Sequence, residues 1–80
     1  MEDQKFLDIC EMYKGELSPF AEQPHFEETY KHILWMLWQI PQFIEEGRKE
    51  KAGRWLGFVQ GVLWAEDVYT IEEMKEHNRP

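Results

Sequence analysis

Apolar side chains recur along this chain at intervals of three and four residues, the spacing that gathers side chains on one face of an α-helix. No stretch alternates apolar and polar residues for long enough to predict a strand. We therefore expect an all-α fold. The first helix is predicted over residues 3–14, with Gly15 as its stop. Its expected buried face holds Phe6, Ile9, Cys10 and Tyr13.

The stretch GELSPFAEQP predicts a loop, because Pro19 and Pro24 interrupt helical hydrogen bonding. We expect Leu17 and Phe20 to pack from this loop against the core. A second helix is predicted over residues 25–46, with Gly47 as its stop. Its expected apolar stripe comprises Phe26, Tyr30, Ile33, Leu34, Leu37 and Ile44, widened by Trp35, Met36 and Trp38.

The third helix is predicted over residues 48–65, and the motif TIEE opens a short last helix as a capping box between Thr70 and Glu73. The chain is thus expected to form one four-helix domain over residues 1–80, built on a long antiparallel hairpin that turns at Gly47. The expected buried side of the third helix holds Ala52, Trp55, Leu56, Val59, Val62 and Leu63.

Three glycines interrupt the third helix at four-residue intervals: Gly53, Gly57 and Gly61. Each costs about 0.8–1 kcal/mol relative to alanine inside a helix, so a compensating contact is expected. Glycines at this spacing form a bare strip that another backbone or a flat ring can approach closely. Two occupants are open: the second helix of the same chain, or a neighbouring subunit or planar ligand.

Four tryptophans are an unusually high number for a chain of 80 residues. A domain of this size has difficulty burying so many large rings, and exposed aromatic surface typically marks an interface. We therefore expect a homo-oligomer. The residues predicted at its interface are Gly53, Gly57, Gly61, Trp35, Trp38 and Phe58.

The net charge is −7, but residues 47–65 hold four basic residues against one acid. The overall negative field disfavours direct binding to duplex nucleic acid. The longest apolar run, ILWMLWQIPQFI, is too short for a membrane span, and the charged start MEDQKFLD predicts no targeting segment. The single cysteine favours a reducing compartment, so we expect a cytoplasmic protein.

The basic residues suggest an anion site at the start of the third helix. Guanidinium and ammonium groups bind phosphate, and indole rings stack on bases. The residues predicted to bind such a ligand are Arg48, Lys51, Arg54, Trp55, Gln60 and Trp64. A solvated turn that pairs with the acidic segments, or a protein contact, would use the same basic residues.

Metal binding and catalysis have weaker signals. His25, Glu28 and His32 share a spacing that could face one metal ion, but no fourth ligand is evident and all three are ordinary near a helix start. Cys10 lies on an apolar stripe with no histidine nearby in sequence, which predicts a packed thiol. We expect no metal, no cofactor and no catalytic residues.

Residues 46–80 read EGRKEKAGRWLGFVQGVLWAEDVYTIEEMKEHNRP. This segment resembles small early proteins of T-even-like bacteriophages, in which an RWLGF.QG.LW core is followed by a TIEE helix and NR. The resemblance implies an accessory protein of the host bacterial cytoplasm that redirects host machinery or blunts host defence. Arg54, Trp55, Gln60 and Gly61 are also similar to a pattern in phage sponge proteins that sequester cyclic nucleotide immune signals.

These observations predict a non-enzymatic, oligomeric accessory protein that counters host defence or regulation by binding. Two mechanisms are open. In the first, a cyclic nucleotide is sequestered between subunits by the basic residues and the tryptophans. In the second, the protein is an acidic inhibitor or DNA mimic that binds a host protein, since an acidic surface can imitate phosphate.

Overall fold

The computed structural model describes residues 1–21 and 26–80, and every regular element in them is helical. The all-α prediction is therefore confirmed. His25, where the second helix was predicted to begin, lies outside the described residues, as does the loop residue Pro24. The elements are α1 (Asp3–Leu17), a short 3-10 helix η1 (Ser18–Phe20), α2 (Glu28–Glu45), α3 (Lys49–Ala65) and α4 (Ile71–Asn78).

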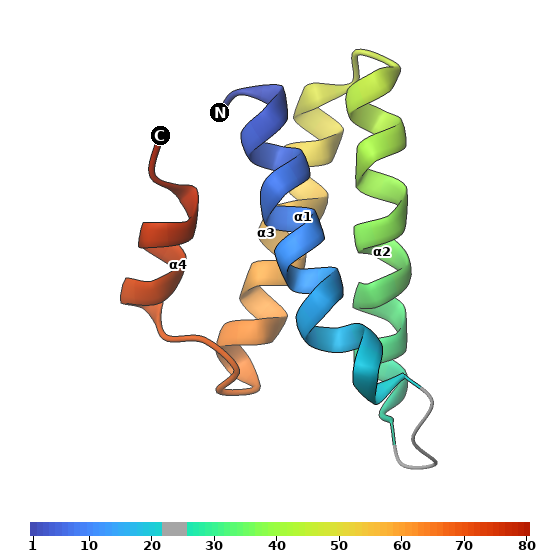
Figure 1. The fold of residues 1–80 in the computed structure, drawn as a ribbon, viewed down its shortest axis with the longest axis vertical. Coiled ribbons are helices and arrows are strands. Elements are labelled where there is room, and N and C mark those ends of the chain that lie inside the picture. The colour runs from blue at the N-terminus through green and yellow to red at the C-terminus, as the bar shows by residue number, and fades with distance from the viewer. Residues whose placement is uncertain (22–25) are drawn as a thin grey trace.

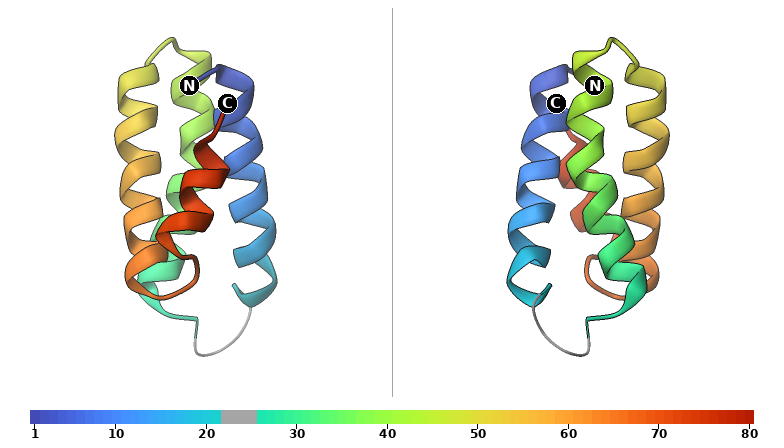
Figure 2. Two further views of the ribbon diagram at one scale, coloured as in Figure 1. Left: turned by 90° about the vertical axis from the view of Figure 1, so that its left-hand side faces the viewer. Right: turned by 90° about the vertical axis from the view of Figure 1, so that its right-hand side faces the viewer.

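Helix α2 packs against both α1 and α3, and it runs in the opposite direction to each (Figure 1). The short helix α4 lies on the side of α1 and α3 that is turned away from α2, and it contacts α1 (Figure 2). The α1/α3 pair is thus covered by α2 on one side and by α4 on the other. In the described part of the chain, no helix combines the length and the hydropathy that a membrane span requires.

The end of α1 differs from the prediction. The helix passes through Gly15 and ends at Leu17, whose side chain is buried. Burial of this side chain accompanies an extension of the helix by three residues, almost one turn, and Pro19 then lies in the following 3-10 turn. Phe20 was predicted to pack on the core, but its side chain is 52 % exposed, so that prediction is wrong.

Gly47 ends α2 as predicted. It has a φ of +76°, and its amide donates to the carbonyl of Ile44 at 3.0 Å. The amide of Arg48 donates to the carbonyl of Phe43 at 2.7 Å. These two bonds form the Schellman motif, in which a left-handed residue satisfies the last carbonyls of a helix.

Asp67 ends α3 in the same way, although it is not glycine. Its φ is +59°, its amide donates to Trp64 at 3.0 Å, and the amide of Val68 donates to Leu63 at 2.9 Å. Aspartate is one of the few residues with a side chain that adopts this conformation readily. This second Schellman turn redirects the chain toward α4.

The predicted capping box at the start of α4 is confirmed. The hydroxyl of Thr70 accepts from the amide of Glu73 at 3.1 Å, and the amide of Thr70 donates to the Glu73 carboxylate at 2.9 Å. These bonds favour the charged carboxylate and hold the pKa of Glu73 below its usual value.

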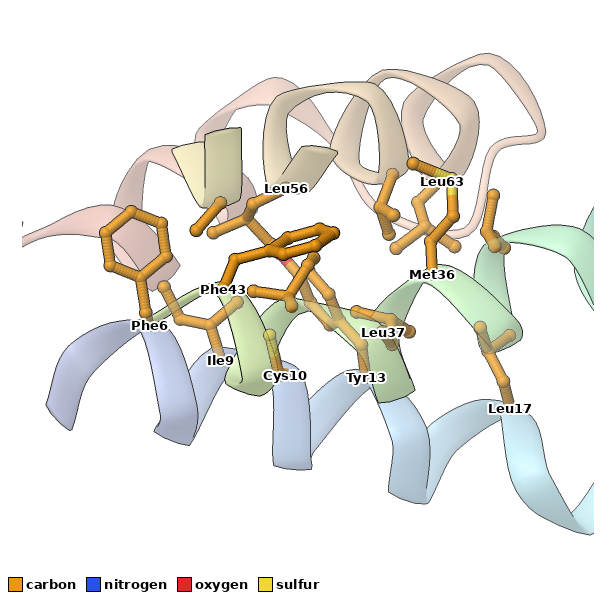
Figure 3. Packing of buried hydrophobic residues seen from close by; sticks show 14 residues of the cluster. Phe6, Ile9, Cys10, Tyr13, Leu17, Met36, Leu37, Phe43, Leu56 and Leu63 are labelled. Carbon is orange, nitrogen blue, oxygen red and sulfur yellow. The ribbon is translucent and has the colours of Figure 1, made fainter. Parts of the chain in front are cut away.

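Three helices supply one continuous core (Figure 3). Helix α1 contributes its predicted face together with Leu17. The buried face of α2 lies closer to α3 than predicted. It includes Ile40 and Phe43, which were not in the predicted stripe, and Phe43 contacts Trp55 of α3. This shift follows because α2 packs on two neighbouring helices at once. The buried cluster comprises Phe6, Ile9, Cys10, Tyr13, Leu17, Ile33, Met36, Leu37, Ile40, Phe43, Ala52, Leu56, Val59 and Leu63.

The glycine strip is not where α2 packs, so that prediction is wrong. A Cβ atom added at Gly53 would lie 3.8 Å from the ring of Phe6, which belongs to α1. Around Gly57 and Gly61 such an atom would meet nothing within 4 Å. The side of α3 that faces the core consists of larger residues, and the strip is left on the surface of this chain. A neighbouring subunit or ligand on the strip stays a prediction.

The open surroundings of Gly57 lead to a test. We expect Gly57→Ala to increase the free energy of unfolding by about 0.8–1 kcal/mol, because alanine is the better helix former and has room for its methyl group. Urea unfolding followed by circular dichroism measures this. An unchanged or lower stability would show that the strip is occupied by something that the methyl group displaces. Gly47→Ala is the control, and it should destabilise because of its positive φ.

Candidate functional site

A cluster of rings lies on the surface where α2 and α3 meet, and we call it the aromatic face: His32, Trp35, Trp55 and Phe58. The rings of Trp35 and Trp55 are 5.6 Å apart between centroids, and His32 lies 5.6 Å from Trp35. Phe58 follows Trp55 by three residues on α3, so the two share one side of the helix. Trp35 is 50 % exposed and Phe58 is 54 % exposed, whereas Trp55 is partly buried.

The aromatic face has a basic end near the turn that joins α2 to α3. The ammonium of Lys51 lies 4.5 Å from the ring of Phe43 and 5.5 Å from that of Trp55. The Phe43 ring in turn meets Trp55 edge to face at 4.7 Å. Arg48 lies 5.5 Å from Phe43 and 3.5 Å from the carboxylate of Glu46. Cations over ring faces are attracted by the ring quadrupole, so this end couples charge to aromatic surface.

The predicted ligand-binding residues do not all meet. Arg48, Lys51 and Arg54 line one shallow depression, and Lys51 connects it to Trp55. Trp64 follows Trp55 by nine residues, which at 3.6 residues per turn places it on the opposite side of α3.

Gln60 also points away from the basic residues. Its side-chain amide donates to the hydroxyl of Tyr13 at 3.1 Å and to the side-chain oxygen of Asn78 at 2.7 Å. Asn78 donates back to the Gln60 oxygen at 3.1 Å. Gln60 therefore holds α4 against α1 and α3, and its side chain is engaged away from Trp55 and the basic residues.

The same network includes His77. Its Nδ1 lies 2.8 Å from the Tyr13 hydroxyl. Because that hydroxyl already accepts from Gln60, it can donate its own hydrogen to Nδ1. The rings of Tyr13, Tyr69 and His77 also pack on one another, with Tyr69 and His77 edge to face at 4.7 Å. Burial raises the pKa of Tyr13 to about 12, so the hydroxyl keeps its proton.

The remaining predicted interface residue, Trp38, lies on the α1 side of α2 and is 61 % exposed. The ammonium of Lys14 sits 4.1 Å from its ring and 2.6 Å from the carboxylate of Glu11. Lys14 is itself buried, with its charge held between a ring and a carboxylate. Trp38 and the aromatic face are thus two separate surfaces of α2.

Cys10 is fully buried in the core. Burial raises the pKa of its thiol to about 11, outweighing the nearby Lys14, which lowers it. A thiol of this kind is protonated at neutral pH, and a protonated thiol is a poor nucleophile. The geometry agrees with the predicted packed thiol.

No cluster of three or more metal-ligating side chains occurs within residues 1–21 and 26–80. Of the three residues whose spacing suggested a metal, His25 lies outside the described residues. Glu28 is paired with Lys31 at 3.5 Å, and the ring of His32 packs on Trp35.

An apolar hollow of about 320 Å³ lies at the other end of the bundle from the basic residues. Glu16 and Glu27 stand beside Phe20, Phe26 and other apolar side chains that line it. Burial raises the pKa of Tyr30 in this lining, and the nearby Glu66 and Glu27 raise it further. The negative charge around this hollow disfavours phosphate, so an anionic ligand is expected at the basic end instead.

Comparison with known proteins identifies no relative: no family model, no curated protein and no solved structure matches this chain.

The network under α4 leads to a prediction. We expect Tyr13→Phe to reduce the free energy of unfolding by about 1–2 kcal/mol, because it leaves the Gln60 amide and the His77 ring short of a partner. Amide hydrogen exchange should accelerate most in residues 71–78. Tyr69→Phe is the matched control, since its ring packs in the same cluster. If the two variants exchange alike, the hydroxyl of Tyr13 does not hold α4.

The buried thiol leads to another prediction. At pH 8 we expect Cys10 to react with iodoacetamide about 100-fold or more slowly in the folded protein than in urea, because a raised pKa removes the thiolate and burial blocks access. Mass spectrometry of the alkylated chain over time measures both rates. Equal rates in the two states would contradict a packed, protonated thiol.

Proposed function

We propose that this chain is a non-enzymatic binding protein that docks on a protein partner through the aromatic face. The observation that carries the proposal is the exposure of Trp35 and Phe58 beside Trp55. Tryptophan and other large side chains dominate the binding energy of protein interfaces. Rings half exposed to water on packed helices are available to a partner with little rearrangement.

The charge around the face favours one class of partner. Arg48, Lys51 and Arg54 stand at one end of it, so a partner segment that combines apolar and acidic side chains fits best. The resemblance to phage early proteins adds that the partner is a protein of the bacterial host. In this proposal the protein acts by occupying a host surface, in line with the predicted anti-defence role.

A second candidate is the sequestration of a cyclic nucleotide. It is favoured by the position of Lys51, whose ammonium lies near the rings of Phe43 and Trp55. Arg48 and Arg54 would then bind phosphate while Trp55 stacks on a base, without Gln60 or Trp64. The geometry favours a protein more, because the depression at the basic end is shallow and small ligands prefer concave sites that enclose them.

The proposal is tested with the immobilised protein and lysate of a bacterial host. We expect Trp35→Ala combined with Phe58→Ala to reduce retention of the bound host protein about 30-fold, the effect of losing a hot spot worth 2 kcal/mol. Trp38→Ala is the matched control, because it removes an equally exposed ring from another surface of α2. Circular dichroism confirms that each variant is folded.

Two results would contradict the proposal. One is retention of the same host protein by the double variant. The other is tight binding of a cyclic nucleotide in calorimetry, abolished by Arg54→Ala, with no host protein retained. The second result would establish the nucleotide candidate in place of the protein partner.

A further inference from the structure

We infer that, when no other partner is bound, the aromatic face is covered by a second copy of this chain, related by a two-fold axis so that the paired helices run antiparallel. This inference rests on the proposed function in using the same surface, and it assigns that surface a specific occupant. Three features of the described residues support it. The exposed rings lie near the middle of the face, its two ends carry opposite charges, and some of these charges form no ion pair within the described residues.

The rings lie near the middle of the face. Trp35 is close to the midpoint of α2 and Phe58 to the midpoint of α3. A two-fold interface presents the same patch from both copies, so it must be self-complementary. An axis through the middle of this face brings the exposed rings of one copy onto those of the other. Burial of these half-exposed rings is the main gain expected from pairing.

The charges at the two ends of the face are opposite. Arg48, Lys49, Lys51 and Arg54 surround the turn at one end, with the single acid Glu50 in the same depression. At the other end lie Glu28, at the start of α2, and Glu66, at the end of α3. In an antiparallel pair the basic end of each copy meets the acidic end of the other, twice per dimer. A parallel pair would place like charges together, which is unfavourable.

Contacts within the chain leave both ends with net charge. Arg48 pairs with Glu46, and Glu28 pairs with Lys31, in each case at 3.5 Å. Neither Arg54 nor Glu66 forms an ion pair within the described residues. Both side chains therefore carry charges that no ion pair neutralises, although Glu66 also lies within hydrogen-bonding reach of the Tyr30 hydroxyl, and they are the residues at which we test the arrangement.

The inference is tested by reversing these charges and measuring mass by sedimentation at micromolar concentrations. The natural chain should sediment as a dimer of about twice its 9.8 kDa. Arg54→Glu alone and Glu66→Lys alone should each weaken the dimer at least about ten-fold, because each places like charges together at both ends. The chain with both reversals should dimerise like the natural chain, since its ends are again complementary.

Lys75→Glu and Glu72→Lys, both on α4, are the charge-matched controls and should leave the mass unchanged. A monomeric natural chain, or a double reversal that fails to restore the dimer, would overturn the inference. Failure of the proposed function is a separate result. Suppose that the charge reversals change the dimer as expected, but the variant without the Trp35 and Phe58 rings still captures the host protein. The dimer is then supported and the proposed host-binding role is contradicted.

Discussion

Helix α2 packs on α1 and α3 at the same time, and this double contact determines which side chains the protein can bury. Its buried side chains must serve two neighbours, so Ile33, Leu37 and Ile40 fill the centre, and Met36 and Phe43 also join the core. The largest rings do not fit there. Trp35 and Trp38 leave α2 on either side of the core, which produces two aromatic surfaces from one helix.

Helix α4 is held differently from the other three. Its packing relies on one well-buried side chain, Met74, and on the side-chain bonds among Tyr13, Gln60, His77 and Asn78. Apolar packing permits neighbouring registers, whereas paired amides and a hydroxyl with one free hydrogen fit in a single arrangement. The polar network thus defines where α4 lies against α1 and α3.

Sequence patterns that act over a few residues predicted the helices, the turn at Gly47 and the capping box of α4. Helical spacing identified the faces of α1 and α3, and the special properties of Gly47 and of the Thr70–Glu73 box act within a few residues. The errors concern contacts between distant residues. Gln60 bonds Tyr13 of α1 and Asn78 of α4, and the residues next to Gln60 in the sequence do not indicate either contact. The spacing of the glycines showed that they share one side of α3, but only the packing of the helices decides that this side is not the one facing α2.

Exposed rings are also a hazard, because they promote unspecific association. The net charge of −7 opposes it by keeping copies of the chain apart in most orientations. The basic residues around Arg54 remove this repulsion locally, at one end of the aromatic face. Approach of an acidic surface from that direction is therefore favoured, whether it belongs to a host protein or to the acidic end of a second copy. In both proposals the occupant lies on the same aromatic face, so a second copy of the chain and a host protein would compete for it.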